Sequence, residues 1–103
     1  MKEIQSEAEF DRFKNADKVL VLFYASWCPF SQMFLPVFEE CSRKNSKSEF
    51  VKIDDNEKLC DKYSVEFYPT VLYLEKGAVA KRIDAKPGVG LNKKKFEELT
   101  HSL

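Results

Sequence analysis

The feature that most constrains the fold is an uncharged run over residues 19–25, VLVLFYA, which is soon followed by Trp27-Cys28-Pro29. A continuous apolar run of this length predicts a strand buried on both faces, as in a parallel or mixed sheet with helices above and below. A helical pattern begins directly after these residues. Cys28 is therefore expected beside the first turn of a helix, where unpaired backbone N–H groups and the helix dipole favour a thiolate. The thiolate is the nucleophilic form of cysteine, so Cys28 is the candidate reactive residue.

The remaining pattern supplies further strands and helices. Apolar residues spaced for one face of a helix follow Cys28, with Pro36 expected to bend that helix: Phe34, Val37, Phe38 and Cys41. Strands are predicted over residues 50–54, 71–74 and 79–84, with a weak one over residues 1–5, and helices over residues 7–17, 57–63 and 91–101. This order predicts a single α/β domain over residues 1–103, with a central mixed sheet sandwiched by helices.

Composition excludes several classes of function. Lysine plus arginine number 17 and aspartate plus glutamate number 17, so the formal net charge is zero. A dedicated nucleic-acid-binding domain would show a strongly basic face. No apolar run approaches the roughly 20 residues that cross a bilayer, and residues 1–6 lack the apolar core of a signal peptide. The odd number of cysteines, three, argues against a disulfide-stapled secreted domain. We expect a cytoplasmic protein without nucleic-acid or membrane partners.

Taken in order, these residues resemble the thioredoxin family over nearly the whole chain. The matching features are Trp27-Cys28 after a buried strand, Pro36 in the next helix, Asp54-Asp55, Tyr68-Pro69-Thr70, Gly77 in the last hairpin and the C-terminal amphipathic helix. The resemblance implies a thioredoxin fold in which Pro69 is cis and packs beside Cys28. It also implies a monomer without cofactor that exchanges disulfides with protein substrates, supplied with electrons by a thioredoxin-reductase-like protein or by glutathione.

The chemistry of such a site would begin when Cys28 attacks a disulfide in a partner protein and becomes bonded to it as a mixed disulfide. Ser31 stands where thioredoxins carry a second, resolving cysteine, and a hydroxyl cannot attack that bond. We expect Ser31 instead to donate a hydrogen bond to the Cys28 sulfur. An extended substrate is expected to pair with the backbone next to Pro69, in a docking groove predicted from five residues: Trp27, Pro29, Phe30, Tyr68 and Pro69.

Ser31 leaves two origins open. It is either the natural residue of a monothiol protein that relies on an outside thiol such as glutathione, or an engineered replacement that traps the partners of a two-cysteine disulfide reductase; we favour the second. Leu22 stands where the family carries a buried acid. Both departures keep a redox-silent binding module as the alternative function, with a glutathione-linked monothiol enzyme as a third.

The other titratable residues have structural explanations. Cys41 lies 13 residues beyond Cys28, roughly 20 Å along one helix, whereas a disulfide needs Cα atoms within about 7 Å. Cys41 therefore cannot resolve the bond, and the reach of Cys60 is open; both are expected to be core residues. Strand-end solvation and helix capping account for Asp54-Asp55. No histidine or cysteine ligands accompany this pair, so no metal is predicted, and His101 is expected to face solvent.

Overall fold

The computed structural model describes all of residues 1–103. Its elements are β1 (Lys2–Ile4), α1 (Glu7–Phe13), β2 (Val19–Tyr24), α2 (Pro29–Lys44), β3 (Glu49–Asp54), α3 (Glu57–Lys62), β4 (Thr70–Glu75), β5 (Ala78–Asp84) and α4 (Lys93–His101). The predicted order is confirmed, including the weak strand at the N-terminus. Two boundaries were wrong, because α1 ends at Phe13 rather than near residue 17 and α4 begins at Lys93 rather than at residue 91.

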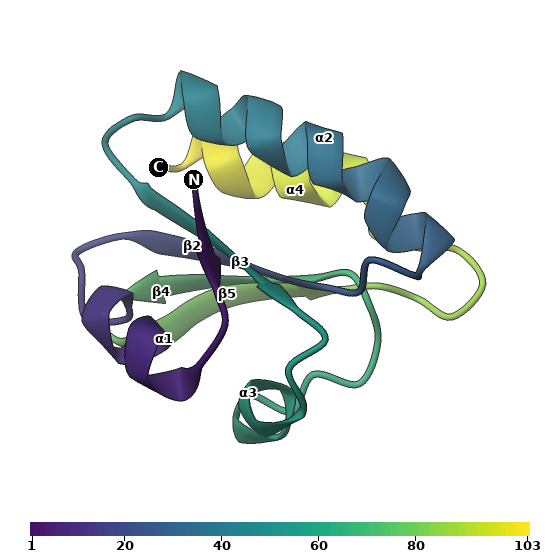
Figure 1. Cartoon of the computed structure of the whole chain (residues 1–103). Helices are drawn as coiled ribbons and strands as arrows, with labels where there is room; N and C mark the ends of the chain where they lie inside the picture. Colours follow the sequence, from purple (N-terminus) through teal and green to yellow (C-terminus); the bar gives the residue numbers. More distant parts are fainter.

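The five strands form one mixed sheet in the order β1-β3-β2-β4-β5. β1, β3 and β2 are parallel, β4 is antiparallel to β2, and β5 is antiparallel to β4. Helices α2 and α4 cover one face of the sheet, and α1 and α3 lie on the other (Figure 1). Phe23 pairs with Thr70, and Thr70 pairs with Asp84. The ends of β2, β3 and β5 and the start of β4 therefore meet at one edge of the sheet.

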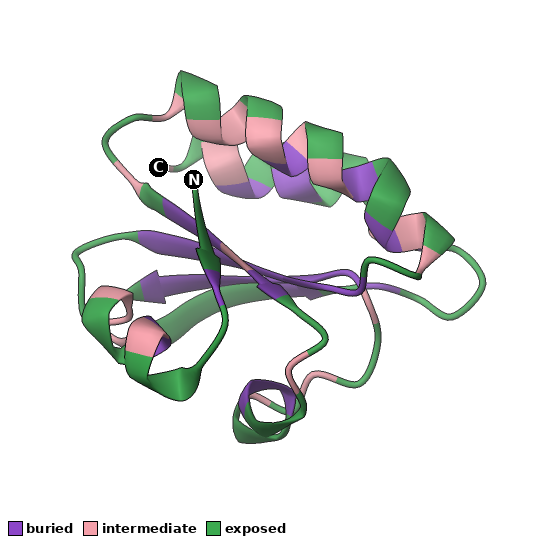
Figure 2. Cartoon of the chain, viewed as in Figure 1, coloured by how far each residue is buried: buried purple, intermediate pink, exposed green.

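Strand β2 is buried along its whole length, because helices cover both faces of the sheet (Figure 2). Its alternate side chains enter different cores, as the period of two in a strand requires. Val19, Val21 and Phe23 pack on the side of α1 and α3. Leu20, Leu22 and Tyr24 pack on the side of α2 and α4. Leu22 is completely buried there among apolar side chains, so the position of the family's buried acid is part of a hydrophobic core in this chain.

Local capping and one long-range contact set the helix boundaries. Ser6 Oγ accepts a hydrogen bond from the Glu9 amide, as the capping box predicts. Asn92 Oδ1 accepts from the Lys95 amide, which explains why α4 begins after Asn92. The α1 helix stops early because the chain turns, and the Ala16 carbonyl then accepts a hydrogen bond from the Lys76 amide in the β4–β5 hairpin.

Candidate functional site

Cys28 is the N-cap residue of α2, at the edge of the sheet where β2 ends. Pro29 occupies the first turn, where a missing N–H costs nothing and the fixed φ suits a helix. The Cys28 side chain makes no capping hydrogen bond, and the residue is half-buried. Its Sγ lies 4.0 Å from the Tyr68 carbonyl oxygen. The sulfur therefore faces the backbone that precedes Pro69.

The Tyr68–Pro69 peptide bond is cis, as predicted. Pro69 is buried, and its carbonyl accepts a hydrogen bond of 3.1 Å from the Ala85 amide just beyond β5. Thr70 Oγ1 donates a hydrogen bond of 2.7 Å to the Phe67 carbonyl, which closes the turn before β4. The segment opposite Cys28 is therefore fastened both to itself and to the chain after β5.

The predicted hydrogen bond from Ser31 to Cys28 is wrong. Ser31 is almost fully buried, at 1% exposure, and its Oγ accepts a hydrogen bond of 3.2 Å from the Ala25 amide. This amide follows the last residue of β2, so it has left the sheet and needs an acceptor. The Ser31 hydroxyl joins the end of β2 to the first turn of α2, and no hydrogen bond links it to the Cys28 sulfur.

Asp55 connects two aromatic side chains near Cys28, the exposed Trp27 and the half-buried Tyr68. Its Oδ2 accepts a hydrogen bond of 3.2 Å from Trp27 Nε1, and its Oδ1 accepts one of 3.1 Å from the Tyr68 hydroxyl. The two rings meet edge to face, with centroids 6.2 Å apart. Trp27 is 67% exposed. The carboxylate therefore fixes the relative position of the indole and the phenol while leaving the indole open to a partner.

The explanation of Asp54 and Asp55 was wrong in part: both side chains are exposed at the end of β3, as expected, but neither caps α3. Asn56 is the N-cap of α3, and Asp54 Oδ1 accepts a hydrogen bond of 3.0 Å from the Ser26 amide in the loop before Cys28. A signal for this role was present in the sequence. Adjacent parallel strands end at the same edge of a sheet, so residues that follow β3 must lie near residues that follow β2.

Sequence reasoning also missed the link between Cys60 and the site. Cys60 is buried, as expected, and its Sγ lies 3.2 Å from the Tyr68 hydroxyl oxygen. Because that hydroxyl donates its proton to Asp55, the Cys60 thiol is the donor in this contact. Burial raises the pKa of the Cys60 thiol, and it also raises the pKa of the half-buried Cys41 thiol. All three cysteines are free.

Pro29 and Phe30, both predicted to line the docking groove, differ in exposure, since Pro29 is exposed and Phe30 is not. Phe30 is half-buried against the loop before α4, where a Cβ added to Gly90 would lie 2.9 Å from Phe30 Cδ1. Gly90 also has φ +93°, so this position requires glycine on both counts. The apolar surface next to Phe30 comes instead from Met33 and Val89, which line a shallow pocket of about 160 Å³.

Other sequence expectations concern surface residues and ligands. His101 is exposed, as predicted. No group of three or more His, Cys, Asp or Glu side chains is arranged to hold a metal ion. None of the helices combines the length and the apolar character that crossing a bilayer would need.

Comparison with known proteins gives a consistent family. A family model described as Thioredoxin matches residues 2–98. Thioredoxin from Mycoplasmoides gallisepticum is 35% identical over 91 residues, covering 84% of this chain and 91% of the relative. Endoplasmic reticulum resident protein 44 from Homo sapiens is 40% identical over 78 residues, covering 66% of this chain but 19% of that protein. The solved structure of Plasmodium falciparum thioredoxin superposes with a TM-score of 0.87 at 28% identity, covering 99% of this chain and 98% of the other. The predicted thioredoxin fold is confirmed.

Proposed function

The chain belongs to the thioredoxin family of thiol–disulfide exchange proteins, and we propose that it attacks disulfides in other proteins with Cys28 as the nucleophile. The Cys28 thiolate forms a new S–S bond with one sulfur of the partner disulfide, and the other sulfur leaves as a thiolate that takes a proton from water. One observation carries this proposal. The half-exposed Cys28 sulfur has no capping bond and faces the Tyr68 carbonyl at 4.0 Å.

The docking groove proposed for the substrate combines free backbone groups with aromatic walls. The amides of residues 66–68 donate no hydrogen bond to another backbone group. An extended substrate segment can therefore pair with the Tyr68 backbone as a short added strand. Trp27 and Tyr68, both held by Asp55, would flank that segment. Pro29 is exposed beside them, whereas Phe30 supports the groove from below by packing on the Gly90 loop.

Ser31 would stop the reaction at the mixed disulfide. Its hydroxyl is buried and bonded to the Ala25 amide, and it cannot act as the resolving thiol. Release then requires an outside thiol, such as glutathione or a reductase-like protein, whether Ser31 is natural or engineered. A redox-silent binding module is the second candidate function, because Leu22 and Ser31 are both buried neutral side chains where the family pattern has an acid and a thiol.

Capture of a protein disulfide tests the proposal. The reduced chain is mixed with insulin, and intact masses are measured without reductant. We expect a covalent adduct that dithiothreitol dissolves. The adduct should be absent from Cys28→Ala and retained in the matched control Cys41→Ala, whose half-buried cysteine lies further along the same helix. Absence of an adduct with the unsubstituted chain would contradict the proposal and favour the redox-silent binding module.

We further propose that the chain works as a monomer in the cytoplasm, where thiols stay reduced. The three free cysteines support the reducing location. Cell fractionation with an antibody against the chain tests the location. Recovery of the chain from an oxidising compartment, with Cys28 in a disulfide, would contradict it.

A further inference from the structure

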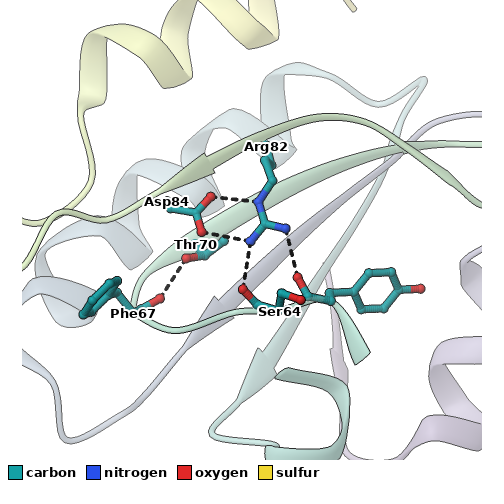
Figure 3. A network of polar contacts seen from close by, with 6 residues as sticks. Ser64, Phe67, Thr70, Arg82 and Asp84 are labelled. Carbon is teal, nitrogen blue, oxygen red and sulfur yellow. Dashed lines mark hydrogen bonds and ion pairs between the residues drawn. The ribbon is translucent and has the colours of Figure 1, made fainter. Parts of the chain in front are cut away.

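A single guanidinium joins β5 to the loop that leads to Tyr68 (Figure 3). Arg82 Nε and Nη2 each donate a hydrogen bond of 2.8 Å to the Asp84 carboxylate. Arg82 Nη1 donates one of 2.9 Å to the Tyr63 carbonyl, and Nη2 donates a second of 3.3 Å to the Ser64 carbonyl. The fork of Arg82 therefore holds a carboxylate on its own strand and two carbonyls on another segment.

The two carbonyls lie at the start of the loop that carries the site. Helix α3 ends at Lys62, so the carbonyls that follow have no helical partner. Ser64 has φ +53°, in the left-handed region that a serine rarely adopts. From Ser64 the chain needs only four more residues to reach Tyr68. Within that stretch, the Val65 amide donates to the Cys60 carbonyl and the Phe67 carbonyl accepts from Thr70 Oγ1. The amides of residues 66–68 between these two bonds make no backbone hydrogen bond, so the middle of the loop depends on how its start is held.

The far end of the same loop is also fastened from the β5 side. The Ala85 amide donates a hydrogen bond to the Pro69 carbonyl, and Asp84 pairs with Thr70 in the β4–β5 ladder. The sheet thus fixes the backbone of Asp84, and the Asp84 carboxylate orients the plane of the Arg82 guanidinium through two parallel hydrogen bonds. Through its bonds to the Tyr63 and Ser64 carbonyls, Arg82 also fastens the start of the loop to β5.

We propose that Arg82 is a positioning residue, which together with Asp84 holds the 63–67 loop so that the Tyr68 backbone lies ready to pair with a protein substrate opposite Cys28. The inference rests on the proposed function. A lysine cannot replace Arg82 in this role, because one ammonium group cannot bond in a fixed fork to a carboxylate and two carbonyls.

The proposal predicts a separation between large and small disulfides. A small disulfide reagent needs only to reach the half-buried Cys28 side chain, whereas a protein segment also needs the Tyr68 backbone in place. Small displacements of a docking segment can cost up to about 100-fold in rate, so we expect Arg82→Ala to lower the rate of mixed-disulfide formation with a protein by about tenfold. The rate with the small reagent should be unchanged.

The experiment compares two second-order rates for each variant. Adduct formation with insulin is followed by intact mass, and reaction with dithiobis(nitrobenzoate) is followed by absorbance. Arg82→Ala and Arg82→Lys should both lose rate selectively with insulin. Lys81→Ala is the matched control, because Lys81 precedes Arg82 on β5 and bonds instead to Ser102; it should leave both rates unchanged. Each unfolding midpoint is measured by thermal denaturation.

Four results would overturn the inference: no change in either rate for Arg82→Ala, an equal loss in both rates, full recovery in Arg82→Lys, or a similar selective loss in Lys81→Ala. Should Arg82→Ala not fold, Asp84→Asn removes the charged anchor of the guanidinium with little change in shape, and it must show the same selective loss. The failure of the proposed function looks different. In that case the unsubstituted chain itself forms no adduct with insulin, and the inference falls with the function.

Discussion

Asp55 offers the clearest quantitative test of how the walls of the site are held. Asp55→Ala removes the hydrogen bonds to Trp27 and Tyr68, each worth about 0.5 kcal/mol at an exposed position. It also places an alanine at φ +45°, which costs roughly 1 kcal/mol because only Gly, Asn and Asp adopt this region readily. Together these terms predict a loss of about 2 kcal/mol in the free energy of unfolding. For a chain of this length that corresponds to a fall of about 10 °C in Tm.

Asp55→Asn separates the two contributions. Asparagine tolerates the left-handed backbone and keeps one acceptor oxygen, so it should lose only about 0.5 kcal/mol. Trp27 is the only tryptophan of the chain, and its fluorescence therefore reports the state of this wall directly. In Asp55→Ala we expect stronger quenching of Trp27 by acrylamide and lower anisotropy, because the indole loses its anchor. Asp61→Ala, at an exposed aspartate on α3, is the control.

Two outcomes would refute this reasoning. Equal destabilisation by alanine and asparagine would show that the backbone conformation of Asp55 carries no cost. Unchanged Trp27 quenching and anisotropy in Asp55→Ala would show that the carboxylate does not hold the indole.

Four further predictions concern the sulfur atoms and the core. Ser31→Cys should give catalytic reduction of insulin under dithiothreitol, and unchanged turnover would show that more than the missing thiol limits release. Iodoacetamide at neutral pH should modify Cys28 before Cys41 and Cys60, because burial raises the pKa of the latter two thiols; peptide masses give the order, and early labelling of Cys60 would contradict it. Burial raises the pKa of the Cys60 thiol in the folded state above its ordinary value of 9.0. The stability that the protonated thiol contributes is therefore fully present below pH 9, and it is lost as the pH rises through the raised pKa. In Cys60→Ala, the free energy of unfolding from denaturation curves should therefore fall less above pH 9 than in the unsubstituted chain. An equal fall in both proteins would refute the raised pKa of Cys60. Phe38→Ala removes a fully buried ring that packs on three others and should cost about 3–5 kcal/mol by denaturant unfolding; a loss below 1 kcal/mol would contradict the close packing.

The order of elements could be predicted because its signals are local, whereas the cis Tyr68–Pro69 bond was implied by the resemblance to the thioredoxin family. Seven uncharged residues predicted β2, and the period of the apolar residues predicted α2. The end of α1 was not predicted, and the residues after it make a contact that is not local, a hydrogen bond from the Lys76 amide to the Ala16 carbonyl. The single-domain assignment and the roles of the site residues stay predictions.

The side-chain partners within the site were the least predictable part. From the sequence, we expected the Ser31 hydroxyl to bond to the Cys28 sulfur. Only the packed structure shows that Ser31 Oγ accepts a hydrogen bond from the Ala25 amide. Arg82 looks like any exposed arginine of an edge strand until the fold brings Tyr63 and Ser64 beside it. Phe30 is half-buried because Gly90, 60 residues later in the sequence, leaves room for its ring.

The meeting of four chain segments at one sheet edge has a consequence for heated protein. Cys28 follows β2, Asp55 follows β3, Tyr68 precedes β4 and Asp84 ends β5, so only the intact sheet keeps these groups together. An unfolded chain still carries a thiol that small disulfides reach, but it has lost the docking groove that would bind a protein substrate. Heating through the unfolding transition should therefore leave the reaction of Cys28 with small disulfides unchanged or faster, while it abolishes mixed-disulfide formation with proteins. The ratio of these two rates would report the fraction of native structure.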